Sequence, residues 1–148
     1  MFYDHNEEYK GIKHLKPLYL AIKKKQVLQI TYKGFLDKES SVFEFHPHIL
    51  KQYNRRWFVF GFNKTKETRE WSIPLDERLI DSYILTDNDY VQSDTDWEVF
   101  FRTMVGVIKP LNAEIERVVL RFHNGRENYF KTKPFQPDFE EFFEEDKK

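Results

Sequence analysis

The sequence contains no cysteine, and only 5 of its 148 residues are glycine. The absence of cysteine excludes disulfides, thiolate zinc ligands and a cysteine nucleophile. The glycines are too scattered to form a dinucleotide-binding fingerprint or a phosphate-binding loop. No run approaches about 18 apolar residues, and the first residues lack the basic and apolar regions of a signal peptide. A cytoplasmic protein without a membrane span is therefore expected.

Motifs that carry catalytic or metal chemistry are also missing. His46 and His48 are the one close histidine pair, and residues i and i+2 of a strand share a face, so both could bind a metal ion. Pro47 between them and the lack of a third ligand nearby argue against such a site. No nucleophile elbow marks a serine hydrolase. We therefore expect a protein that is not an enzyme, with no catalytic residue, no metal and no cofactor.

Aromatic residues and an uneven charge distribution are the prominent features of what is present. Aromatics make up 18% of the chain, which excludes disorder over its whole length. The formal net charge is only −1, but Lys10 to Arg78 carries 15 basic and 7 acidic residues, and the remainder carries 9 and 18. This asymmetry favours an anionic partner for the basic part, with ordinary solvated lysines as the alternative.

The hydrophobic periodicity predicts one helix followed by five short strands. Helical spacing of apolar residues predicts a helix over residues 11–25. The run Trp57 to Phe62 is apolar at successive positions, which is typical of a central strand covered on both faces. Pro47 indicates an edge or a bulge, and Asn54-Arg55 a tight turn. The other strands are predicted at residues 28–32, 43–46, 69–73 and 82–85.

The C-terminal part is expected to be only partly folded on its own. Asp96 and its neighbours offer caps for a helix with Trp97 and Phe100 on its apolar face. Residues 115–122 are predicted as a strand, and residues 126–132 as a short helix after an Asn124-Gly125 turn. One strand, one short helix and an acidic tail rich in phenylalanine cannot bury a core alone.

Together these elements predict a mainly β, α+β protein with a small five-strand barrel that closes to remove its edges. The expected organisation is a lead-in (residues 1–10), the barrel with its N-terminal helix (11–93), a connecting helix and linker (94–110) and a partial C-terminal extension (111–148).

The most informative stretch for function is His46 to Leu79, in which a basic and aromatic run adjoins the central strand. Guanidinium groups bind phosphate bidentately, and aromatic rings stack on bases, so this run predicts an anionic, stackable ligand. A turn with solvated charges is the alternative, with a salt bridge from Arg78 to Asp76 or Asp81 in particular. The candidate ligand-binding residues are Arg56, Arg78, Arg55, Lys51, Tyr53, Trp57, Tyr32 and His46.

The same stretch resembles a WYL domain of the Bacteroidetes type. Trp57-Phe58-Val59 stands where that family has Trp-Tyr-Leu, and Leu75-Asp76-Glu77-Arg78-Leu79 is similar to its Leu-Asp-Arg-Ile. The resemblance extends from Gly11 to Pro134. It departs at Phe58 and Val59, and at Gln136 and Asp138 of the C-terminal extension, where the family has His and Ser.

The resemblance implies an Sm-like, SH3-like barrel that senses ligands in bacterial transcriptional regulators. It implies binding of single-stranded nucleic acid or a nucleotide, and contact with operator DNA only through a winged-helix domain, which this chain is expected to lack. The competing hypothesis is a barrel for protein–protein interaction, such as a homodimer, with the acidic tail as a docking segment. An enzyme such as a nuclease has the least support, because no carboxylate cluster occurs in the basic region.

Overall fold

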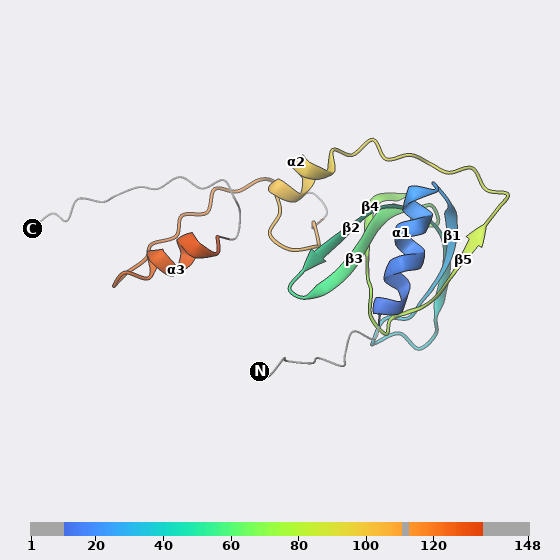
Figure 1. The fold of residues 1–148 in the computed structure, drawn as a ribbon, viewed down its shortest axis with the longest axis horizontal. Coiled ribbons are helices and arrows are strands. Elements are labelled where there is room, and N and C mark those ends of the chain that lie inside the picture. Colours follow the sequence, from blue (N-terminus) through green and yellow to red (C-terminus); the bar gives the residue numbers. More distant parts are fainter. Residues whose placement is uncertain (1–10, 111–112, 135–148) are drawn as a thin grey trace, which may run out of the picture. The chain divides into compact units, whose positions relative to one another are not determined.

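The computed structural model of the protein describes residues 11–110 and 113–134. The chain divides into two compact units, Met1–Thr95 and Asp96–Lys148, which are described separately. The first contains η1 (Ile12–His14), α1 (Leu15–Lys23), β1 (Val27–Tyr32), β2 (Ser41–Tyr53), β3 (Arg56–Asn63), β4 (Thr68–Pro74) and β5 (Leu79–Leu85), as Figure 1 shows. The predicted class, a mainly antiparallel five-strand sheet with a few helices, is confirmed.

The five strands form one antiparallel sheet in the order β4-β3-β2-β1-β5. Asn54 and Arg55, between β2 and β3, have φ of 46° and 62°, the left-handed pair of a two-residue hairpin turn. Pro47 pairs with Gly61 and Ile49 with Phe60, so His48 is the extra residue of a bulge. Both the turn and the bulge agree with the sequence prediction, and the bulge lets β2 continue past Pro47 to Tyr53.

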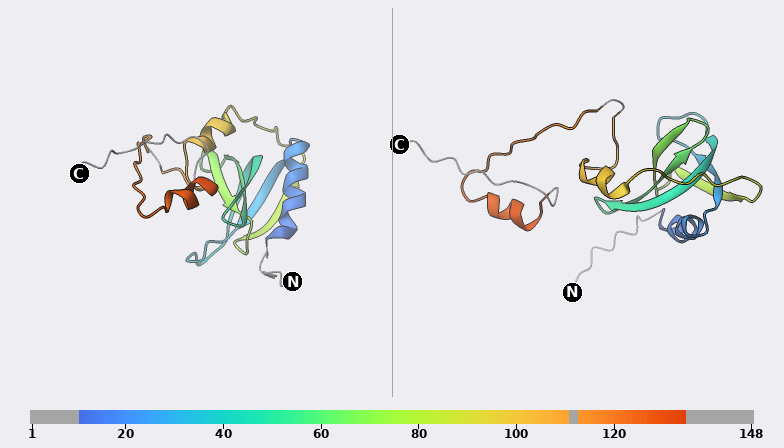
Figure 2. Two further views of the ribbon diagram at one scale, coloured as in Figure 1. Left: turned by 60° about the vertical axis from the view of Figure 1, so that its left-hand side comes forward. Right: turned by 90° about the horizontal axis from the view of Figure 1, so that it is seen from above.

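The sheet is curved but is not closed into a barrel, which corrects the predicted architecture. Within the described residues, β4 pairs only with β3 and β5 only with β1. The chain between them uses its backbone groups elsewhere: Leu75 donates its N–H to the Trp57 carbonyl, and the Arg78 carbonyl accepts from Lys33. A loop therefore bridges the gap where the ladder of a closed barrel would run. Figure 2 shows the curvature from two directions.

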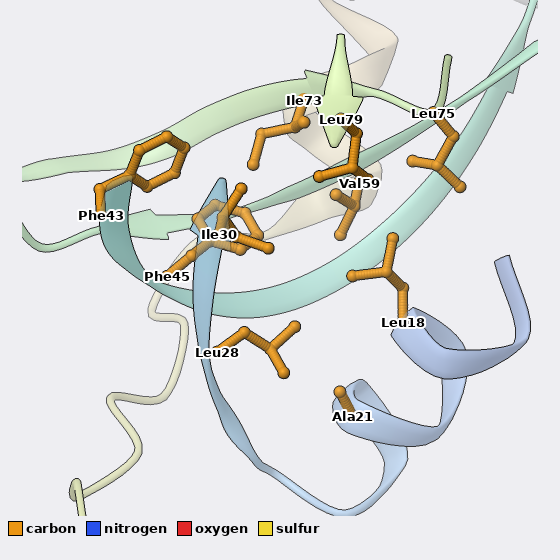
Figure 3. Close-up of a cluster of buried hydrophobic side chains, with 10 residues drawn as sticks. All are labelled: Leu18, Ala21, Leu28, Ile30, Phe43, Phe45, Val59, Ile73, Leu75 and Leu79. Carbon is orange, nitrogen blue, oxygen red and sulfur yellow. The ribbon is translucent and has the colours of Figure 1, made fainter. Parts of the chain in front are cut away.

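Helix α1 packs on the concave side of the sheet and completes the core. Leu18 and Ala21 of α1 point toward the sheet residues Leu28, Ile30 and Val59 in Figure 3. The alternation within each strand sends one set of side chains to this core and the other set to the opposite face. The remaining buried members are Phe43, Phe45, Ile73, Leu75 and Leu79.

The second unit contains two short helices in its described part, α2 (Trp97–Arg102) and α3 (Glu127–Thr132). Asp96 caps α2 by accepting hydrogen bonds from the backbone N–H groups of Glu98 and Val99, as predicted. The strand predicted at residues 115–122 is wrong: those residues form no ladder, and Val118 and Val119 are largely exposed. A strand needs a partner, and the described part of this unit supplies none.

The predicted lead-in of residues 1–10 and the acidic tail, with Gln136 and Asp138, lie outside the described residues. Among the helices described, none has the length and apolar character needed to cross a membrane.

Candidate ligand-binding site

Two arginines, Arg56 at the start of β3 and Arg78 just before β5, converge on the carboxylate of Asp76. Arg78 binds it with two nitrogens, Nε at 3.0 Å from Oδ1 and Nη2 at 2.7 Å from Oδ2. Arg56 Nη1 lies 3.2 Å from Oδ2. The Asp76 side chain is 14% exposed and that of Arg78 21%, whereas that of Arg56 is 50% exposed. The cluster is thus anchored below the surface and open on the Arg56 side.

The loop that carries Asp76 is fixed by its own backbone. Asp76 Oδ1 also accepts the backbone N–H of Arg78, and the Asp76 carbonyl accepts from Leu79, so residues 76–79 form a tight turn. Gly11 lies against the Leu75–Asp76 peptide so closely that a Cβ there would overlap it. The start of the N-terminal helical segment therefore supports the loop that carries Asp76 and Arg78.

Two aromatic residues adjoin Arg78. The guanidinium carbon of Arg78 lies 4.8 Å from the ring centroid of Phe35, a cation–π contact, and Phe35 is 67% exposed. Tyr32, at the end of β1, lies beside Arg78: burial raises the pKa of its hydroxyl, and the positive charge of Arg78 acts in the opposite direction. The cluster thus has a polar side and an exposed ring.

The charges of the cluster stabilise one another. Burial alone would raise the pKa of Asp76, but the Arg78 hydrogen bonds and the charges of Arg78 and Arg56 hold it below its ordinary value. The hydrogen bond to Asp76 raises the pKa of Arg78 in turn. Two positive groups therefore face one ionised carboxylate at neutral pH, so the three side chains Arg56, Asp76 and Arg78 together carry a net charge of +1.

The other candidates on the β2–β3 hairpin lie near Arg56 in the chain but outside the Asp76 contacts. Arg55 occupies the exposed turn, and Tyr53, which pairs with Arg56, is 41% exposed. Lys51 is partly buried, and this burial lowers the pKa of its ammonium group. Trp57 is partly buried and packs against the core.

His46 is the one candidate that the structure places well apart from the arginines. It pairs with Phe62, six residues along β3 from Arg56, a separation of roughly 20 Å at about 3.3 Å per residue. Its ring is fully buried and hydrogen-bonded to Glu44 and to the backbone of Val91. The alternation of β2, in which Phe43 and Phe45 enter the core, directs it to the opposite face of the sheet.

Sequence reasoning named Asp76 only as an alternative partner for Arg78 and did not name Phe35. Asp76 could have been identified from its position two residues before Arg78. At this spacing an aspartate in a turn accepts a hydrogen bond from the backbone N–H of the later residue. Phe35 follows Gly34 in a polar turn. An aromatic residue in such a turn is far from the core, and this position was the signal that it is exposed. Among the described residues, no group of three or more histidine, aspartate or glutamate side chains could hold a metal ion.

Comparison with known proteins bears on this hairpin and its surroundings. Residues 13–73 match the family model of the WYL domain. The match contains Tyr32, Phe35 and Arg56 and ends shortly before Asp76 and Arg78. A solved structure similar to the chain is proteasome accessory factor B/C (PafBC) of Arthrobacter aurescens, with 14% identity and a TM-score of 0.47. The likeness covers 51% of this chain and 12% of that one. No curated protein matches the chain.

Proposed function

We propose that this chain is a ligand-sensing regulatory module that binds single-stranded nucleic acid, or a nucleotide-like anion, at the Arg56–Asp76–Arg78 cluster. The observation that carries the proposal is the convergence of two guanidinium groups on one carboxylate beside an exposed aromatic ring. The WYL match over residues 13–73 supports the regulatory role. Operator DNA would be contacted by a separate winged-helix domain.

The cluster suits such a ligand for two physical reasons. Asp76 fixes the plane of the Arg78 guanidinium group, so less side-chain entropy is lost when a phosphate binds its outer nitrogen. Phe35 stacks on the same group and exposes most of its ring, on which a base can stack. Arg56, half-exposed at the rim, adds a second phosphate contact.

Binding of a labelled single-stranded DNA oligomer, measured by fluorescence anisotropy over a series of salt concentrations, tests the proposal. The wild-type protein is expected to bind and to weaken as salt rises, because phosphate contacts release counterions. Arg56→Ala and Arg78→Ala are each expected to weaken binding and to flatten the log–log salt dependence by about 0.7. Phe35→Ala is expected to weaken binding without changing that slope.

Arg69→Ala is the matched control. Arg69 is 53% exposed and pairs with Asp94 at 3.1 Å, so it resembles Arg56 in exposure and partner but lies outside the cluster. It should leave affinity and salt dependence close to those of the wild type. Absence of oligomer and nucleotide binding at low salt, or equal losses in all three arginine variants, would contradict the proposed site.

A second candidate function is self-association through β5. Its Tyr83 and Ile84 are 58% and 52% exposed, and β5 is an edge strand of the described sheet. Exposed apolar edges favour pairing with another chain. If this is the function, sedimentation velocity is expected to show a dimer that Tyr83→Lys converts to a monomer. A wild-type protein that sediments as a monomer at high concentration excludes it.

A further inference from the structure

The segment after β5, residues 86–95, is attached to the face of the sheet opposite the core and is called the strap here. The Tyr90 hydroxyl donates to the Pro47 carbonyl at 2.7 Å, and the Asn88 amide donates to Glu44 at 2.6 Å. Farther along, Asp94 pairs with Arg69 of β4 and Thr95 donates to Glu70. Figure 1 traces the strap in yellow between β5 and the start of the second unit. The strap is thus held by side chains and not by a strand ladder.

The centre of the strap is held by two histidines of β2, the buried His46 and the partly buried His48, the extra residue of the bulge. The backbone N–H of Val91 donates to Nδ1 of His46 at 3.0 Å, and the Val91 carbonyl lies 2.9 Å from Nε2 of His48. His46 Nε2 lies 3.1 Å from Glu44 Oε1. Both rings thus reach Val91 and bond its two backbone groups.

These contacts fix the protonation state of His46. Its Nδ1 accepts a hydrogen bond from an N–H group, so it carries no proton, and its Nε2 therefore donates to the Glu44 carboxylate. If Nδ1 were protonated, it would be a donor facing the Val91 N–H, another donor, and this hydrogen bond would be lost. Neutral His46 is required for the closed strap, whereas protonated His46 is compatible only with a strap that has moved away.

We propose that the strap is a proton-controlled latch, which is closed when His46 is neutral and opens when His46 becomes protonated. Opening removes the contact between Val91 and both imidazoles. It also takes the ring of Tyr90, on the strap, away from that of His46, which lies 5.9 Å from it in the closed state. The latch would make the segment that joins the sheet to the second unit sensitive to acidification.

The charged groups around the two rings agree with this assignment. His46 faces Glu44 on its own strand, and Lys64 after β3. Burial lowers the pKa of His46, while Glu44 acts in the opposite direction and can hold the imidazolium once the strap has left. His48 faces Arg69, Glu70 and Asp94, and burial lowers its pKa also. The closed strap therefore disfavours protonation of His46, whereas at His48 the hydrogen bond to the Val91 carbonyl raises the pKa against the larger effect of burial.

The direction of the pH effect follows from these lowered pKa values. A histidine whose pKa is lower in the closed state favours closure fully above its ordinary value of 6.5. That contribution is lost progressively as the pH falls below this value. The equilibrium constant for opening should rise by up to about tenfold per pH unit for His46 alone, and more steeply if His48 titrates with it.

Amide hydrogen exchange measured by NMR, expressed as protection factors at pH 7.5, 6.5 and 5.5, tests the latch. Protection factors remove the intrinsic pH dependence of exchange. The Val91 amide is expected to lose protection by about fivefold between pH 6.5 and 5.5, and by more if His48 titrates with His46, while the amide of the fully buried core residue Ile30 keeps its protection. Nitrogen-15 spectra of the histidine rings should show His46 as the Nε2–H tautomer at pH 7.5.

Two variants separate the latch from a general loosening of the strap. His46→Asn keeps a side-chain acceptor but cannot titrate, so Val91 protection should depend less on pH. Tyr90→Phe removes the bond to the Pro47 carbonyl and should lower protection by the same factor at every pH. Wild-type Val91 protection that is constant from pH 7.5 to 5.5, or that falls together with that of Ile30, overturns the proposal even if His46→Asn fails to fold.

Discussion

Replacing Gly61 by alanine is expected to lower the free energy of unfolding by about 3 kcal/mol or more. Gly61 lies in the central strand β3, opposite Pro47 at the bulge. A Cβ at this position would overlap the His46 carbonyl and press on the ring of Phe45. Neither can move cheaply, because one is backbone inside the sheet and the other is a fully buried core side chain. Equilibrium unfolding in urea, followed by circular dichroism, measures the effect.

Gly34→Ala is the matched control for this prediction. Its Cβ would meet only the Asp37 side chain, whose end can rotate away into solvent. The same substitution should therefore change the unfolding free energy by no more than about 1 kcal/mol. Equal losses in the two variants would contradict the prediction that overlap of the added Cβ with β2 destabilises Gly61→Ala.

The Gly61 contact illustrates how far the sequence could specify the sheet. Alternation and the apolar run from Trp57 to Phe62 identified the strands, because burial on one face or two leaves a pattern in each strand. Asn54-Arg55 identified the hairpin. Pro47 indicated the bulge, but the identity of its extra residue, His48, depends on register, which is a property of two strands together.

Closure of the sheet was predicted wrongly for a related reason. Five short strands suggest a barrel, but closure depends on where the backbone groups after β4 find partners. Leu75 and Arg78 bond to β3 and to Lys33, and no local pattern encodes that choice. The strand predicted at residues 115–122 failed similarly: its alternation describes a suitable strand, but pairing requires a neighbour that the described part of the second unit does not offer.

The sequence identified the two arginines of the candidate site as ligand-binding residues, but it did not identify Asp76 as part of that site. Arg56 and Arg78 stood out because positive charge concentrates in the first half of the chain. Asp76 reduces that charge and so looked like a competing explanation for Arg78. In the structure, Arg78 forms the salt bridge to Asp76, and Arg56 binds the same carboxylate. The salt bridge and the clustering of the two arginines therefore occur together. His46 was chosen for its strand position, but it lies on the face opposite that of Phe45 and contacts the strap instead.

Asp76→Asn is expected to destabilise the fold by about 2 kcal/mol while strengthening anion binding. The amide keeps an acceptor for the Arg78 backbone but leaves two guanidinium groups facing each other without a counter-charge. The same change raises the net charge of the cluster by one. Oligomer affinity at low salt should therefore rise, and the log–log salt dependence should steepen by about 0.7. Urea unfolding and anisotropy on the same samples measure both effects.

Asp94→Asn provides the comparison, because Asp94 is 71% exposed and pairs with a half-exposed arginine; its loss should cost less than about 1 kcal/mol. The pH dependence is a further check. Because the pKa of Asp76 is lower in the folded protein than its ordinary value of 3.8, its contribution is complete above that value and is lost as the pH falls further. The difference in unfolding free energy between wild type and Asp76→Asn should therefore shrink below about pH 4. A difference that persists there would mean that Asp76 stabilises the loop through its shape and hydrogen bonds and not through its charge.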